Sequence, residues 1–152
     1  MKKSFIYLAT LILIFSCNAK SQTDTVETQV GNLINDEPVF SVNKQTLIRI
    51  FNTNLLALSG INGNFKDANI IKDENGNYFL VFTGESYKST FSVFIKNDNK
   101  LIARAGTTCT TSECATQPLG CIPSPPYYTS CTPCANKGKC TKTVSNISLL
   151  EK

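Results

Sequence analysis

The chain has 152 residues, a formal net charge of +4 and no histidine. This length predicts one domain, and the lack of histidine excludes Ser-His and Cys-His nucleophile systems as well as histidine metal ligands. The small and scattered positive excess is not the footprint of a nucleic-acid-binding protein, so no nucleic-acid partner is expected.

The first residues, MKKSFIYLATLILIFSC, combine a basic start with a short apolar run. Lys2 and Lys3 precede the run 5–15, which is too short for a membrane span of ~20 residues. The pattern is typical of a secretory signal peptide over residues 1–16. It ends in IFSC, residues 14–17, which resembles the lipobox of bacterial lipoproteins and, in its second residue, those of Bacteroidota.

The resemblance implies cleavage before Cys17, acylation of that cysteine and anchoring in membrane lipid, because two acyl chains hold a protein stably. Cleavage removes two lysines and leaves 13 of the 15 basic residues against 11 acidic ones, a net charge of +2. The location implied is the bacterial cell envelope. No acidic cluster resembling a surface-export signal follows Cys17, so we expect a protein that faces the periplasm.

Residues 17–37 are polar and carry few large apolar side chains. Such a segment buries too little surface to become ordered, so the sequence predicts a flexible tether. Within it, the triplet Asp-Thr-Val at residues 24–26 resembles the O-glycosylation motif of Bacteroidota, with Thr25 as the acceptor.

Residues 38–106 carry the patterns of a folded domain. Residues 42–59 are predicted to be a helix with one apolar stripe facing the core, made of Leu47, Phe51, Leu55 and Leu58. Ser41 or Asn43 can cap the start of the helix, and Gly60 suits its end.

The hydrophobic period then changes to that of strands. About four antiparallel strands are predicted, over residues 67–73, 77–83, 88–96 and 100–105. Asn75-Gly76 is a strong two-residue hairpin signal, and the strand 77–83 is apolar on both faces, which predicts a central position. The fold class is α+β, with one helix packed on an antiparallel meander whose apolar face it covers.

Residues 107–152 form a cysteine-rich segment with almost no aliphatic core. Its six cysteines are Cys109, Cys114, Cys121, Cys131, Cys134 and Cys140. A segment this polar needs covalent or metal staples. Export to an oxidising compartment favours disulfides, and assigning Cys17 to lipid leaves an even count. Six cysteines allow 15 connectivities, among which the sequence does not choose.

Two other interpretations of the cysteines stay open. Only Cys131 and Cys134 have the C-x2-C spacing of a zinc ligand pair, where structural zinc usually has two such pairs. The same quartet, Cys-Thr-Pro-Cys, resembles thioredoxin-like redox motifs, although it lacks the strand and long helix around such a motif. We expect no cofactor and no metal.

The loop PSPPYY, residues 123–128, is stiff and carries paired tyrosines. Tyr127 and Tyr128 are candidates for contact with an envelope protein partner, or they lie over the disulfides as a small apolar cap. The tail 141–150 alternates briefly and is expected to return as an edge strand.

Without a histidine base or clustered carboxylates, an enzyme is not the default. The sequence favours a non-catalytic structural or binding module at the envelope. The alternatives are a thiol–disulfide oxidoreductase or electron carrier that uses Cys131 and Cys134, and a cysteine-ligated metal protein.

Overall fold

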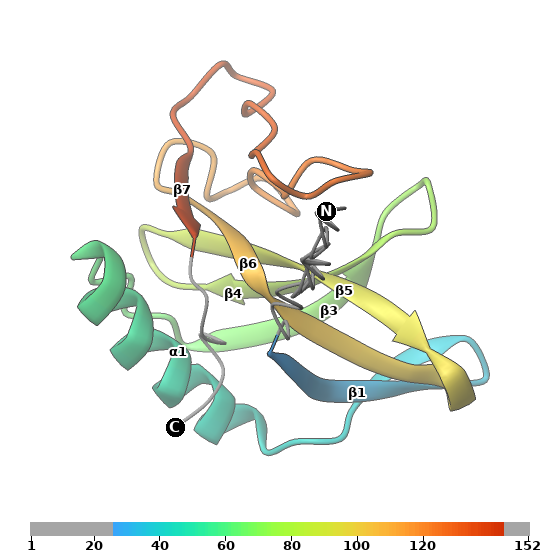
Figure 1. Cartoon of the computed structure of the whole chain (residues 1–152). Coiled ribbons are helices and arrows are strands. Elements are labelled where there is room, and N and C mark those ends of the chain that lie inside the picture. Colours follow the sequence, from blue (N-terminus) through green and yellow to red (C-terminus); the bar gives the residue numbers. More distant parts are fainter. Residues whose placement is uncertain (1–25, 145–152) are drawn as a thin grey trace, which may run out of the picture.

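The computed structural model describes residues 26–144, which form a mixed α+β fold around one antiparallel sheet (Figure 1). Its elements in chain order are β1 Glu27–Ile34, β2 Glu37–Phe40, α1 Lys44–Ser59, β3 Asp67–Lys72, β4 Tyr78–Thr83, β5 Lys88–Lys96, the 3-10 turn η1 Asn97–Asn99, β6 Lys100–Thr111 and β7 Thr141–Val144. Within this part of the chain, no helix has both the length and the apolar character that a membrane crossing requires.

The sheet has the strand order β2-β1-β6-β5-β4-β3, with β7 also paired to β6. One edge of β6 pairs with β5 along most of its length, while its other edge pairs first with β1 and then with β7. The two ends of the order, β2 and β3, come into contact, so the sheet nearly closes on itself. β6 therefore lies between the β5-β4-β3 part of the sheet on one edge and the strands β1 and β7 on the other.

The predicted helix is confirmed with its start and end signals. The side chain of Asn43 accepts a hydrogen bond from the amide of Thr46 at 2.9 Å, and Gly60 adopts the left-handed conformation that ends α1. Leu47, Phe51 and Leu55 are buried as predicted. The assignment of Leu58 to the core is wrong, because this residue in the last turn is 47% exposed.

Aromatic rings make the centre of the core between α1 and the sheet. Phe51 on the helix stacks on Phe82 of β4 at 4.0 Å between ring centroids and meets Phe91 of β5 edge-on at 5.3 Å. Phe65, in the connection before β3, completes the cluster at 5.1 Å from Phe51. We call the side of the sheet that carries Leu80, Phe82 and Phe91 the helix face.

The opposite side of the sheet is also buried. Successive strand residues point to opposite faces, so Phe79 and Val81 of β4 point away from α1, yet both are buried. Val81 lies opposite Thr90, and Thr90 lies opposite Cys109, so these side chains share one side of the sheet, which we call the cysteine face. In Figure 1 the loops of residues 112–140 (orange) lie above the sheet, and α1 lies below and to the left.

The four predicted strands are confirmed, and the strand count is larger than predicted. β1 and β2 occupy residues 27–34 and 37–40, so the prediction of a flexible tether as far as residue 37 is wrong for this part. These polar residues are ordered because β1 pairs with both β2 and β6. β6 also continues to Thr111, past the boundary expected at residue 106, and the tail returns as β7.

Candidate functional site

All six candidate cysteines of the C-terminal segment are paired in three disulfides. Cys109 is bonded to Cys131, Cys114 to Cys134 and Cys121 to Cys140. The bridges span 22, 20 and 19 residues, and they join the first cysteine to the fourth, the second to the fifth and the third to the sixth. In this interleaved pairing the loops that the three bridges close overlap, so residues 109–140 are cross-linked along their whole length.

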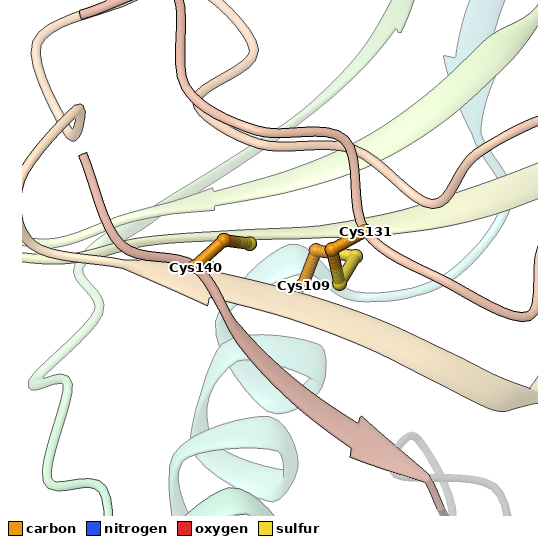
Figure 2. A group of neighbouring side chains, drawn as sticks. All are labelled: Cys109, Cys131 and Cys140. Carbon is orange, nitrogen blue, oxygen red and sulfur yellow. A yellow bond between two sulfur atoms is a disulfide. The ribbon is translucent and has the colours of Figure 1, made fainter. Parts of the chain in front are cut away.

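The Cys-Thr-Pro-Cys quartet does not form a bridge of its own. Cys131 and Cys134 have different partners, and the sulfurs of Cys109, Cys131 and Cys140 lie within 4.8 Å of one another. Figure 2 shows the bonded pair Cys109 and Cys131 beside Cys140. Since each of these sulfurs is already in a disulfide, the cluster is a crossing point of two bridges and offers no thiolate to a metal.

Polar contacts dock the cysteine-rich segment onto the sheet. The hydroxyl of Thr90 donates to the carbonyl of Leu119 at 2.8 Å, and the ammonium of Lys88 donates to the carbonyl of Gln117. Burial of Lys88 lowers the pKa of its ammonium. Gly120 approaches this lysine closely, and its φ of +65° is one that glycine adopts without strain.

The two tyrosines of the 123–128 loop occupy different positions. Tyr128 meets the ring of Phe94 edge-on at 5.2 Å between centroids, while Tyr127 is 82% exposed. Among the described residues, the partly buried apolar side chains packed on the buried cysteines are those of Cys131 and Cys140, and neither tyrosine is among them. The interpretation of the tyrosines as a cap over the disulfides is therefore wrong, and their role in partner contact stays a prediction.

Tyr127 and Tyr128 line an open cleft of about 460 Å³. We call it the Tyr127 cleft; its lining residues are Ser92, Phe94, Arg104, Ala105, Gly106, Thr107, Pro126, Tyr127, Tyr128, Thr129 and Val144. Its volume lies within the ~300–1,000 Å³ of small-molecule sites. The cleft thus combines the 123–128 loop with the middle of β6 and the end of β7.

A bulge in β6 forms the floor of the cleft. Phe91 pairs with Thr108 and Val93 pairs with Ala103, so the single residue Ser92 of β5 faces four residues of β6, 104–107. Gly106 in this bulge has a φ of +150°, and a side chain added there would meet open space. Ser92 is 8% exposed, and its hydroxyl has no hydrogen-bond partner among residues 26–144.

The charges around the cleft are predominantly positive. The guanidinium of Arg104 lies 4.5 Å from the ring centroid of Phe94, and its Nε donates to Glu27 at 3.0 Å. The Lys96 ammonium that hydrogen-bonds Glu27 holds the pKa of this carboxyl below its usual range, and Arg104 adds to the effect. On the other rim, Lys142 donates to the carbonyl of Thr129 at 3.2 Å. Two cations, Lys96 and Arg104, therefore share the carboxylate of Glu27.

Sequence reasoning identified the tyrosines of this site and missed Phe94 and Arg104. The available signal was Gly106, because a glycine inside a strand pattern often marks a bulge. The predictions of lipidation at Cys17 and glycosylation at Thr25 lie outside the described residues. Comparisons of the chain with protein-family models, with curated protein sequences and with solved structures found no match.

Proposed function

We infer that the protein is a membrane-anchored envelope lipoprotein whose domain is a non-catalytic binding module. The observation that carries this proposal is the exposed ring of Tyr127 at the rim of the Tyr127 cleft. A large exposed aromatic beside a preformed concavity is the usual composition of a binding site. The N-terminal resemblance to lipoproteins supplies the anchor at Cys17, with membrane lipid as its partner.

The three disulfides support a location outside the cytoplasm, because such bridges form and persist in oxidising compartments. They also support binding over redox chemistry. A C-x-x-C oxidoreductase cycles between a dithiol and a bridge within the motif, whereas Cys131 and Cys134 are each bonded to a cysteine outside it. The same bonds leave both sulfurs without the thiolate that a metal ligand requires.

Mass spectrometry of the native, non-reduced protein tests the anchor. The expected result is an acylated peptide that begins at Cys17, with peptides joined through the three bridges. A native chain that retains residues 1–16, or that begins elsewhere without lipid, would overturn the assignment as a lipoprotein.

Site-specific photo-crosslinking in the producing cells tests the binding module. Tyr127 is replaced by benzoylphenylalanine, and the matched control carries the same group at Asn75, an exposed residue of the β3–β4 turn. We expect a discrete adduct from position 127 and none from position 75. Identical adduct patterns from the two positions would contradict a binding site at the cleft.

A further inference from the structure

We propose that the Tyr127 cleft binds an acidic saccharide, with a sugar ring on Tyr127 and the carboxylate or phosphate of the sugar at Arg104. This proposal names a ligand class for the binding module. It rests on the proposed function in one respect, which is that the Tyr127 cleft is the binding surface. The shape of the cleft, its charge and the state of its polar groups support this ligand class.

The shape of the cleft fits a sugar ring. Tyr127 presents an exposed aromatic ring, while Tyr128 is held against Phe94 and forms a fixed wall. The C–H face of a pyranose ring packs on an aromatic face, and its hydroxyls require polar groups at the edge of the same site. The hydroxyls of Thr107 and Thr129 and the irregular backbone of the β6 bulge lie there.

The charge around the cleft selects an acidic ligand. Arg104 and Lys96 share the single carboxylate of Glu27, and Lys142, which donates to the carbonyl of Thr129, forms no ion pair within residues 26–144. Arg104 uses its Nε for Glu27, which leaves its two amino groups without a partner in the described part of the chain. A guanidinium with two free N–H₂ groups binds a carboxylate or phosphate through paired hydrogen bonds.

The floor of the cleft carries a polar group that the fold leaves unsatisfied. The hydroxyl of Ser92 is buried and has no partner among residues 26–144. A buried polar group without a partner costs stability, and such groups are found where a ligand or water completes the bonding. Ser92 lies directly opposite the bulge that opens the cleft.

The surrounding strands argue against a peptide ligand. A peptide that adds to a sheet needs a free strand edge. β6 is paired with β5 on one edge and with β1 and β7 on the other, and the amide of Ala105 between them donates to the carbonyl of Val26 at 2.8 Å. Within the cleft, the edge of β6 that faces β1 and β7 is therefore not open to β-addition.

Isothermal titration of the full chain, purified without reductant, tests the proposal with three probes. Trigalacturonate carries sugar rings and charge, its methyl ester carries the rings alone, and triglutamate carries the charge alone. We expect saturable binding of trigalacturonate and at least tenfold weaker binding of the other two. Lack of saturable binding to trigalacturonate, or equal binding of either comparison probe, would overturn the proposal.

Variants assign the binding to the cleft. Tyr127→Ala is expected to weaken trigalacturonate binding at least fivefold, while Tyr127→Phe retains the ring and the affinity. Arg104→Gln is expected to weaken binding at least tenfold, whereas Lys72→Gln, a loss of charge on β3 three strands from β6, leaves it unchanged. Wild-type affinity in both Tyr127→Ala and Arg104→Gln would place the ligand elsewhere.

The outcomes separate this inference from the proposed function. Binding of trigalacturonate by a native chain that carries no lipid on Cys17 would contradict the lipid anchor and support the proposed ligand. A lipidated chain that crosslinks through position 127 but binds none of the three probes would support the binding module and contradict the acidic saccharide as its ligand.

Discussion

The helix face and the cysteine face lie back to back on the same strands, and they are covered by different means. On the helix face, α1 brings apolar and aromatic side chains such as Phe51 onto Phe82 and Phe91. On the cysteine face, the covering segment is polar and is held through Thr90 and through three disulfides. Hydrophobic burial stabilises the first face, whereas cross-links that restrict the unfolded chain stabilise the second.

The largest expected loss of stability comes from the centre of the helix face. Phe51→Ala removes the ring that contacts Phe65, Phe82 and Phe91. We expect the free energy of unfolding in urea to fall by about 3–5 kcal/mol. Leu58→Ala, on the same helix but half exposed, is expected to change it by no more than about 0.5 kcal/mol. Similar losses of unfolding free energy in the two variants would mean that the ring of Phe51 is not central to the packing of the core.

Removal of one bridge tests the cysteine face. Cys121→Ala combined with Cys140→Ala opens a loop with a sequence separation of 19 residues, which predicts a loss of about 3 kcal/mol. Amide hydrogen exchange is expected to show weaker protection in residues 112–140 and unchanged protection in α1 and β4. Equal loss of protection in both regions would show that the two faces unfold as one unit.

A pair of identical substitutions compares the polar requirements of the two faces. Thr90→Val leaves the carbonyl of Leu119 without its hydroxyl donor, so we expect a loss of about 1–2 kcal/mol in urea unfolding. Thr108 pairs with Phe91 on the helix face, and its buried hydroxyl has no partner in the described chain. Thr108→Val is therefore expected to leave stability unchanged or to raise it by up to about 1 kcal/mol. A greater loss from Thr108→Val than from Thr90→Val would reverse the comparison.

The smallest expected effect concerns the ion pairs of Glu27 with Lys96 and Arg104, which connect β1 to β5 and β6 beside the Tyr127 cleft. The pKa of Glu27 is lowered below its ordinary value of 4.5, chiefly by its hydrogen bond from Lys96. At a pH between the lowered pKa and 4.5, the unfolded chain binds more protons at Glu27 than the folded chain does. The stabilisation by the ion pairs of Glu27 is therefore complete above pH 4.5 and is lost as the pH falls through the pKa of the folded state.

The measurement is the urea midpoint from pH 6 to pH 3, compared between the wild type and Glu27→Gln. The decline with acidity is expected to be shallower in the variant. Because both side chains are partly exposed to water, the difference is small and decreases further in high salt. Parallel declines would show that the ion pair with Lys96 does not contribute to folding.

The regular part of the fold could be predicted because its side chains follow a clear period. The stripe through Leu47, Phe51 and Leu55 and the hairpin signal at Asn75-Gly76 both correspond to observed elements. β1 was missed because four of its eight residues are polar and only Val30 and Gly31 are buried. Its order comes from pairing with distant strands, which local composition does not report.

The cysteines and the cleft were predictable to different degrees. The sequence predicted disulfides from the even count and the expected compartment, but the pairing depends on where β6 places Cys109 against the returning chain. Tyr127 and Tyr128 were singled out from a short motif. Arg104 and Phe94 were missed because they reach the cleft through a bulge, and a bulge changes which residues face each other across strands.

The start of β1 lies beside the cleft, because the carbonyl of Val26 accepts a hydrogen bond from Ala105 in the cleft wall. On the lipoprotein proposal, nine residues lie between Cys17 and Glu27, and the ten Cα–Cα steps that join these two residues can extend to about 35 Å at most. The cleft is then confined to a thin layer above the membrane that carries the anchor. A ligand displayed on that membrane meets it at an effective concentration that can reach about millimolar, so weak intrinsic affinity is enough for occupancy.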